Sequence, residues 1–248
     1  MRDMSPGSID AVVTSPPYNL DIKYGKYEDA KPRDQYLSWL REVFLQVRRV
    51  LKDSGHLFLN IGYSNVDPWI GMDVAQAIRE DWVLQNHINW VKSIYVNGKT
   101  SGHFKPINSK RFTCPTWEHL FHFTKDGKRE VDRLAVGAPY EYYEGNLRNG
   151  HTAETKPNLR DKGNCWFVPY ETINSKALKG RHPAIFPVRL VEDCLRLAGS
   201  PGTVLDPFVG TGTTAVAARN LGWDAIGLDI DSDYIDFAKT RLALDSNT

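Results

Sequence analysis

The first ninety residues alternate between two kinds of hydrophobic spacing. Short apolar runs, which are typical of buried strands, occupy residues 9–14 and 56–61, and residues 83–91 look like a further strand. Between these runs, apolar side chains recur every three or four residues, which is the spacing of an amphipathic helix. Strand, helix, strand, helix and strand in this order predict a parallel sheet whose helices form the crossovers.

The ends of the two helices can be predicted from local residues. The first helix is expected over residues 36–51, with Asp34 as its N-cap and Gly55 beyond its end. The second is expected over residues 67–80, because Pro68 is well tolerated in a first helical turn.

This order is lost in the middle of the chain and returns near its end. Residues 97–115 are polar and basic without a period and predict a long loop, whereas residues 117–124 alternate like a strand. Residues 125–181 are irregular and are interpreted as an inserted segment. A helix, a strand, a helix, a strand and a final helix are then expected at residues 187–198, 203–206, 213–221, 223–229 and 233–244. The predicted fold class is therefore α/β, with a mostly parallel sheet.

Two prolines end the first strand abruptly, in the sequence Ser15-Pro16-Pro17-Tyr18. Proline has no N–H and a fixed φ, so the loop that follows the strand must be stiff. The loop lies at the carboxyl end of a strand, which is where open α/β sheets bind ligands. It presents a hydroxyl, a rigid carbonyl and an aromatic ring, and we interpret it as a functional loop.

A glycine-rich loop joins the strand at 203–206 to the next helix. Its sequence is Asp206-Pro207-Phe208-Val209-Gly210-Thr211-Gly212-Thr213-Thr214. Gly210 and Gly212 permit a tight turn and a close approach of the backbone to a ligand, and the helix N-terminus offers free N–H groups. Asp229 ends the following strand, where an acidic side chain can accept hydrogen bonds from ribose hydroxyls. The pattern predicts a site for an adenosine-containing cofactor.

Two cofactors compete for this loop. The glycine spacing formally matches the pattern of NAD-binding oxidoreductases. However, the Asp206 carboxylate would repel phosphates and attract a cation, and Pro207 and Phe208 leave little room for a pyrophosphate. S-adenosylmethionine carries an ammonium and a sulfonium group and no phosphate, and it is therefore the favoured cofactor, with NAD as the alternative.

Both motifs resemble those of one enzyme family. Residues 14–19 look like the catalytic motif of DNA amino-methyltransferases, and residues 206–214 look like their S-adenosylmethionine motif. The catalytic motif comes first, which is similar to the beta arrangement, a circularly permuted order with the target-recognition region between the motifs. The resemblance implies a Rossmann-like methyltransferase sheet with a catalytic half, a target-recognition insertion that includes the strand near 117–124, and a cofactor-binding half, at residues 1–96, 97–181 and 182–248.

The resemblance also implies roles for individual residues. The expected catalytic residues are Ser15, Pro16, Pro17 and Tyr18. The expected cofactor-binding residues are Asp206, Pro207, Phe208, Gly210, Gly212, Thr213, Thr214 and Asp229, together with His182 and Phe186 from a segment that closes over the methionine part of the cofactor in the family. The implied substrate is double-stranded DNA, whose target base is flipped out of the helix and methylated on an exocyclic amine.

The choice of base depends on Ser15. Serine at this motif position goes mostly with N4-cytosine methylation in the family, whereas aspartate goes mostly with N6-adenine, so cytosine is favoured and adenine is the alternative. The Ser15 hydroxyl and the Pro16 carbonyl can accept hydrogen bonds from an amine, and Tyr18 offers a face for stacking. Methylation at carbon-5 of cytosine needs a cysteine nucleophile, usually after a proline, and no proline precedes Cys114, Cys165 or Cys194. Methylation of RNA or of a protein amide and DNA binding without catalysis are further alternatives.

The charge distribution is polarised although the net charge is only +1. Residues 99–189 carry 16 Lys and Arg against 9 Asp and Glu, whereas residues 190–248 carry 4 against 9. A basic middle segment suits contact with phosphates, although a solvated basic insertion would have the same composition.

The remaining composition bears on the cellular compartment, on metal binding and on membrane insertion. Three scattered cysteines and seven histidines without ligand spacing predict a reducing compartment and no metal site. No apolar run approaches the ~20 residues of a membrane span, and the N-terminus has no apolar signal segment. We therefore expect a cytoplasmic enzyme without a membrane partner. A cognate restriction endonuclease that acts separately and a second copy of the chain are the other partners considered.

Overall fold

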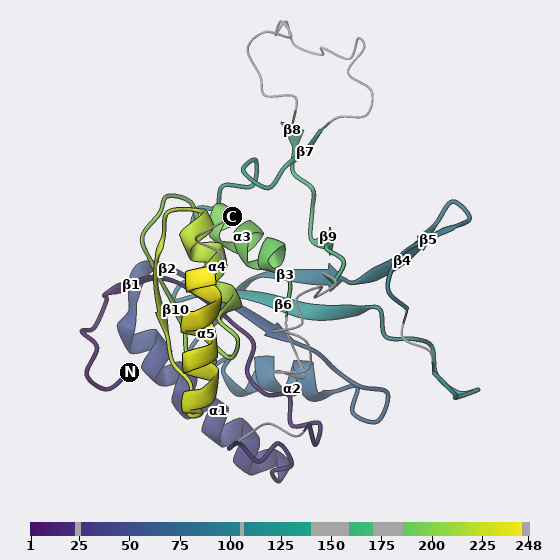
Figure 1. The fold of residues 1–248 in the computed structure, drawn as a ribbon, viewed down its shortest axis with the longest axis horizontal. Helices are drawn as coiled ribbons and strands as arrows, with labels where there is room; N and C mark the ends of the chain where they lie inside the picture. The colour runs from purple at the N-terminus through teal and green to yellow at the C-terminus, as the bar shows by residue number, and fades with distance from the viewer. Residues whose placement is uncertain (23–25, 105–106, 140–158, 171–185, 245–248) are drawn as a thin grey trace, which may run out of the picture.

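The computed structural model describes residues 1–22, 26–104, 107–139, 159–170 and 186–244. The strands of its central sheet are β1 (Ile9–Thr14), β2 (Leu51–Ile61), β3 (Val83–Val91), β6 (Trp117–Thr124), β9 (Cys165–Phe167), β10 (Thr203–Asp206) and β11 (Asp224–Gly227). They are arranged in the order β11–β10–β1–β2–β6–β3–β9 (Figure 1). Neighbouring strands are parallel except around β6, which is antiparallel to both β2 and β3. The predicted mostly parallel α/β sheet is confirmed.

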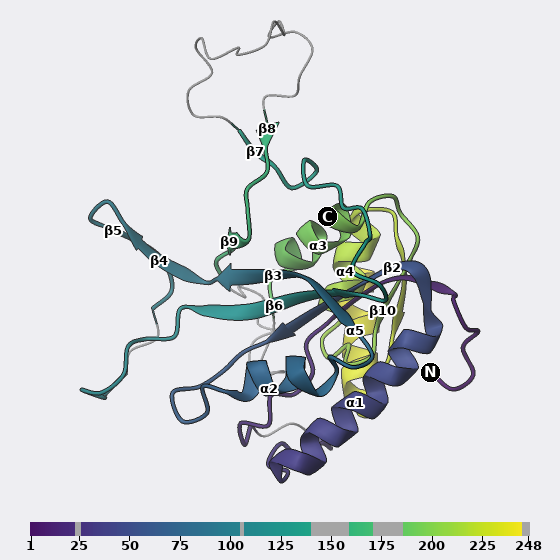
Figure 2. The same ribbon diagram turned by 180° about the vertical axis from the view of Figure 1, so that it is seen from behind.

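Helices cover both faces of this sheet. They are α1 (Arg33–Val50), α2 (Ile70–Ala77), α3 (Val188–Ala198), α4 (Thr213–Asn220) and α5 (Ser232–Leu244). The first two pack on one face and α3 and α4 pack on the other, with α5 beside α4. Figure 2 shows α1 and α2 in front of the sheet and α3 and α4 behind it. Within the described ranges, no helix is long and apolar enough to cross a membrane.

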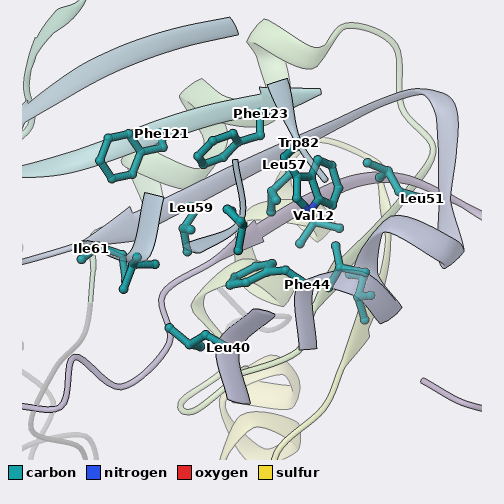
Figure 3. Close-up of a cluster of buried hydrophobic side chains, with 14 of the residues drawn as sticks. Val12, Leu40, Phe44, Leu51, Leu57, Leu59, Ile61, Trp82, Phe121 and Phe123 are labelled. Atoms are coloured by element: carbon teal, nitrogen blue, oxygen red, sulfur yellow. The ribbon is translucent and has the colours of Figure 1, made fainter. Parts of the chain in front are cut away.

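The alternation of side chains along β2 explains why the sheet is buried on both faces. Leu57, Leu59 and Ile61 point into the cluster beneath α1 and α2, whereas Phe58 points into the cluster beneath α3 and α4. Figure 3 shows the first cluster, in which Phe44 of α1 reaches toward the sheet. These side chains are fully buried, and burial of each contributes about 1.5–3 kcal/mol to folding.

The predicted N-cap of the first helix is wrong, whereas its predicted end at residue 51 lies one residue beyond the observed end. The helix starts directly after Pro32 without a side-chain cap, and Asp34 lies in its first turn, where its charge still favours the helix dipole. Strand β2 begins at Leu51, immediately after α1, so Gly55 lies inside this strand. A Cβ atom at Gly55 would come within 2.9 Å of the Asp10 carbonyl oxygen, so glycine is needed there for the close approach of β1 and β2.

The second helix is shorter than predicted because a turn precedes it. The Asp67 N–H donates to Ser64 Oγ at 3.0 Å, and the Ser64 N–H donates to the Asp67 carbonyl at 3.2 Å. The helix therefore begins at Ile70 instead of Asp67, and it ends at Ala77.

The prediction of a long loop over residues 97–115 is wrong in its first part. β4 (Ser93–Val96) and β5 (Lys99–Gly102) form an antiparallel hairpin that projects from the sheet (Figure 1). Asn97 and Gly98 at its tip have φ of +51° and +77°, as in the type I′ turns that Asn-Gly favours. The Asn-Gly pair is the sequence signal for this hairpin.

Part of the predicted insertion belongs to the central sheet. Both β6 and β9 pair with β3, while β7 (Ala138–Pro139) pairs with β8 (Leu159–Arg160) away from the sheet. The division of the chain at residues 97 and 181 stays a prediction.

Candidate active site

The two predicted motifs meet at one edge of the sheet. β1 lies between β10 and β2 and is parallel to both, with Ala11 opposite Val204 on one side and His56 on the other. The chain leaves β1 toward α1 on one face and leaves β10 toward α4 on the opposite face, which opens a crevice between the two loops. A cavity of about 250 Å³ lies in this crevice and is lined by both motifs.

The predicted site residues divide into those that line this cavity and those that do not. Those lining it are Ser15, Pro16, Pro17, Tyr18, Phe186, Pro207, Phe208, Gly210, Thr213 and Asp229. Asp206, Gly212 and Thr214 are buried behind the cavity wall, and His182 lies outside the described residues. Across the described ranges, no group of His, Cys, Asp and Glu is arranged to hold a metal ion.

Two hydrogen bonds hold the loop from Ser15 to Tyr18. The Tyr36 hydroxyl of α1 donates a 2.7 Å hydrogen bond to the Pro17 carbonyl. Ser15 Oγ lies 2.9 Å from Tyr18 Oη. Since the prolines also fix φ, the groups of this loop that face the cavity need little reorganisation to receive a ligand.

A polar cluster beside Tyr18 was not predicted from the sequence. The Tyr18 hydroxyl lies 2.9 Å from Asn60 Oδ1 and 3.0 Å from Glu118 Oε2, and Lys92 Nζ donates to Glu118 Oε1 at 2.9 Å. Burial, and then the charge of Glu118, raises the pKa of Tyr18 well above its ordinary value. Asn60 and Glu118 come together because β6 is antiparallel, so its first residues lie beside the last residues of β2.

Two further aromatic rings line the cavity next to this polar cluster. Trp90 and Tyr170 pack edge to face with centroids 5.4 Å apart, and the Trp90 indole N–H donates to the Val168 carbonyl. Burial, and then the charge of Glu118, raises the pKa of Tyr170. Trp90 therefore packs and lines the cavity at once.

Asp206 links the two motifs from behind the cavity. Its carboxylate accepts hydrogen bonds from Thr14 Oγ1 at 2.6 Å, Thr214 Oγ1 at 2.7 Å and the Phe208 N–H at 3.1 Å. The side chain is almost fully buried, and this burial raises its pKa to about 6. The structure thus places the carboxylate between the end of β1 and the start of α4, although the sequence suggests a direct contact with a cationic cofactor.

The glycine-rich loop depends on its backbone conformation. Gly210 and Gly212 have φ of +47° and +81°, and a Cβ atom on Gly212 would lie 2.8 Å from the Ala238 Cβ of α5. The Asp229 carboxylate accepts the N–H groups of Gly210 at 3.0 Å and of Asp231 at 2.9 Å, one on each oxygen. Each oxygen keeps a lone pair for a hydroxyl donor, which suits the ribose of a nucleoside cofactor.

Aromatic rings close the side of the cavity next to the glycine-rich loop. The Trp39 ring packs edge-on against Phe208, with centroids 5.6 Å apart, and stacks with Tyr27 at 5.2 Å. The neighbouring Lys26 lies 3.6 Å from the Asp231 carboxylate. The Trp39 ring therefore packs against its neighbours and lines the cavity as well.

A sheet of this kind with two such loops at one cavity defines the class of Rossmann-like methyltransferases that use S-adenosylmethionine. Two solved structures have the same fold. PvuII DNA methyltransferase (cytosine-N4-specific) has a TM-score of 0.72 at 19% identity, over 97% of this chain and 81% of that one. TTHA0409 of Thermus thermophilus, solved with S-adenosyl-L-methionine, has a TM-score of 0.61 at 24% identity, over 98% of this chain and 88% of that one.

The sequence profile of the DNA methylase family matches residues 9–240, and the chain belongs to this family. The Type II methyltransferase M.HpaI of Haemophilus parainfluenzae is 29% identical over 254 residues, which are 100% of this chain and 72% of that protein. M.BglII of Bacillus subtilis is 30% identical over 96% of this chain and 64% of its own length. The predicted family and cofactor are confirmed: the protein is an S-adenosylmethionine-dependent DNA methyltransferase.

Proposed function

We propose that this enzyme methylates the N4 amine of cytosine within a specific sequence of duplex DNA. The observation that carries the proposal is the uncharged Ser15 hydroxyl, which lines the cavity at the first position of the catalytic motif. The cytosine-N4-specific PvuII enzyme shares the fold, which supports the same choice of base. The relatives named Type II methyltransferases support a role in restriction and modification. A separately acting endonuclease and self-association of the chain stay part of this proposal.

The chemistry requires the enzyme to activate a weak nucleophile. The lone pair of an exocyclic amine is conjugated into the base, so the nitrogen is planar and poorly nucleophilic. Ser15 Oγ and the Pro16 carbonyl accept hydrogen bonds from the two N–H groups, which favours a pyramidal nitrogen with a free lone pair. When bound, S-adenosylmethionine would supply an electrophilic methyl group: the nitrogen–carbon bond forms as the sulfur–carbon bond breaks, S-adenosylhomocysteine leaves, and the methylated nitrogen gives up one proton. The rigid loop contributes by holding the amine in the attacking geometry.

Base and cofactor take separate places in the cavity in this proposal. Aromatic rings of Tyr18, Trp90 and Tyr170 line the part next to Ser15 and offer surfaces for a flipped base. The cofactor side is lined by the glycine-rich loop, and there the Asp229 carboxylate accepts ribose hydroxyls. A base inside a duplex could not reach such a cavity, so the target must leave the stack.

The β4–β5 hairpin provides a surface for the DNA beside this cavity. No Asp or Glu occurs from residue 82 to residue 117. The hairpin carries Lys99 and the Tyr95 side chain, which is 67% exposed, and Lys110 and Arg111 follow in the next loop. A two-stranded ribbon fits the major groove of B-DNA. We infer that the hairpin, which spans the start of the predicted target-recognition insertion at residue 97, and this loop contact the duplex.

Sequencing the methylome of a bacterial host that expresses the chain tests the proposal. We expect N4-methylcytosine at one short sequence motif with the wild type and no such mark with Ser15→Ala. Ser8→Ala, a change at an exposed serine outside the cavity, should leave the pattern intact. N6-methyladenine at the motif would overturn the choice of base, and an unmodified genome with soluble wild-type protein would overturn the activity.

A further inference from the structure

We propose that Glu118 is a positioning residue that makes Ser15 a hydrogen-bond acceptor, acting through the Tyr18 hydroxyl. The inference rests on the proposed methylation of an amine and concerns the same cavity. It gives a role to the polar cluster of Asn60, Lys92 and Glu118, which lies beside the catalytic loop and has no other part in the chemistry.

The Glu118 carboxylate is held on both of its oxygens. Oε1 accepts a 2.9 Å hydrogen bond from Lys92 Nζ, and Oε2 accepts a 3.2 Å bond from Asn60 Nδ2. Both members of the Lys92–Glu118 ion pair are largely buried, with side chains 14% and 10% exposed. A carboxylate paired in this way offers only acceptor sites to a further neighbour.

The Asn60 amide has only one orientation that satisfies its surroundings. Its Nδ2 group donates to Glu118 Oε2 and to the His119 carbonyl, which lies at 3.0 Å. Because both of these partners are acceptors, the amide nitrogen must face them and Oδ1 must face Tyr18 Oη, at 2.9 Å. The second neighbour of the Tyr18 hydroxyl is therefore an acceptor as well.

These two acceptors decide the direction of the contact between Tyr18 and Ser15. A phenol has a single proton, and the high pKa of Tyr18 keeps that proton on the oxygen. The proton is directed to Glu118 or Asn60, so the 2.9 Å bond to Tyr18 Oη must be donated by Ser15. The Ser15 hydroxyl proton then points away from the base, and the lone pairs of Ser15 Oγ stay available for the amine.

The opposite orientation would hinder the reaction. A serine that directs its proton toward the amine would donate to the lone pair that has to attack the methyl group. Fixing the hydroxyl in advance also avoids the cost of turning it during the reaction, which is how preorganised polar groups lower a barrier.

The test is Glu118→Gln, which changes the charge with little change in shape. Lys92 will retain the carbonyl oxygen of the new amide, so the NH2 group will face Tyr18 and compete with Ser15 for the phenol oxygen, while Asn60 Nδ2 loses this acceptor and keeps the His119 carbonyl. We expect kcat at saturating DNA and S-adenosylmethionine to fall by about 10- to 100-fold. KM for both substrates and the Kd for S-adenosylmethionine should stay within a factor of about two.

A double-mutant cycle with Tyr18→Phe separates positioning from a general structural effect. If Glu118 acts through the Tyr18 hydroxyl, Glu118→Gln will cost no further activity in the Tyr18→Phe background, because the link is already broken. Independent structural roles would instead multiply the two losses. Full wild-type kcat in Glu118→Gln, or multiplicative losses in the cycle, would overturn the inference.

Two controls keep the result decisive. Glu118→Gln leaves the Lys92 charge without its partner, so the cycle is repeated with Lys92→Met present, which removes this charge. Glu80→Gln is the matched control, because its side chain is 77% exposed and far from the cavity lining, and it should keep wild-type kcat. Wild-type protein without methyl transfer to DNA would refute the proposed function itself, whereas an active wild type with an equally active Glu118→Gln refutes only the role of Glu118.

Discussion

The two halves of the active-site cavity are built in opposite ways. The proposed cofactor half comes mainly from one continuous stretch, residues 206–214, whose backbone conformation shapes it, together with Asp229 and the wall of Tyr27 and Trp39. The target half gathers side chains from a loop and two strands, with Ser15, Asn60 and Glu118 meeting around one phenol. Substitutions in the first half should therefore reduce cofactor binding and stability, whereas substitutions in the second should reduce turnover.

The strongest test of this contrast is Ser15→Ala. We expect kcat to fall by about 10²- to 10³-fold, because one preorganised hydrogen-bond acceptor for the amine is lost. The Kd for S-adenosylmethionine should not change, since the cofactor half stays intact. Single-turnover transfer of a labelled methyl group, combined with calorimetric titration of the cofactor, separates the two quantities. An equal loss of cofactor affinity would contradict the division into two halves.

Asp206→Ala should act mainly on folding. It leaves the Thr14 hydroxyl and the Phe208 N–H without their acceptor, whereas the Thr214 hydroxyl keeps the Val13 carbonyl at 3.3 Å. With a penalty of about 1–3 kcal/mol for each buried polar group, we expect the free energy of unfolding in urea to drop by about 3 kcal/mol. Asp224→Ala, at an exposed position of β11, is the matched control. Unchanged stability with reduced cofactor affinity would instead place the carboxylate in direct contact with the cofactor.

Acid should destabilise the protein through the buried histidines of the sheet near the target half. Burial lowers the pKa of His56 and His119 to about 4 and that of His122 to about 3, and it also lowers the pKa of His87. Below pH ~6.5 the unfolded chain binds protons that the folded protein excludes, so this stability is complete above pH ~6.5 and is lost as the pH falls toward 4.

Asp206 works in the opposite direction, because its folded pKa of about 6 lies above the unfolded value and favours the fold as the pH drops. Burial also raises the pKa of Asp29, but four histidines outweigh these two carboxyls, so we expect a net loss on the order of 1 kcal/mol per pH unit or more between pH 6.5 and 5. Thermal unfolding midpoints across this range measure it, and His122→Phe should make the decline shallower. A midpoint that rises on acidification would show that these histidines are not held neutral.

The smallest expected effect concerns the β4–β5 hairpin. Lys99→Gln should weaken DNA binding similarly for all sequences and lower the slope of log K against log salt by about 1. Lys239→Gln, at an exposed position of α5, should leave that slope unchanged. Fluorescence anisotropy with a labelled duplex over a salt series measures both, and equal slopes for Lys99→Gln and the wild type would remove the hairpin from the DNA contact.

The same contrast explains which parts of the site could be predicted from the sequence. The glycine-rich loop and the Ser-Pro-Pro-Tyr loop are local patterns, so both were predictable, as was their meeting at one edge of a parallel sheet. Glu118 and Asn60 were not, because their contact depends on the antiparallel insertion of β6 between β2 and β3, which no local pattern encodes.

The direction of the Asp206 side chain could not be predicted from the sequence either. An acid beside two glycines suggests a ligand for the cofactor, but Thr14 and Thr214 draw the Asp206 carboxylate behind the cavity wall. Thr14 is distant in the sequence, so this arrangement needs the register between β1 and β10. By contrast, Asn97-Gly98 carried a readable turn signal, which the polar composition of residues 97–115 obscured.

The central claim is that one cavity joins the Ser-Pro-Pro-Tyr loop to the cofactor loop and transfers a methyl group to N4 of cytosine. The most direct measurement is mass spectrometry of the nucleosides from duplex DNA incubated with the purified protein and S-adenosylmethionine. The account predicts N4-methyldeoxycytidine with the wild type and none with Ser15→Ala. N6-methyldeoxyadenosine, or no methylated nucleoside at all, would contradict it.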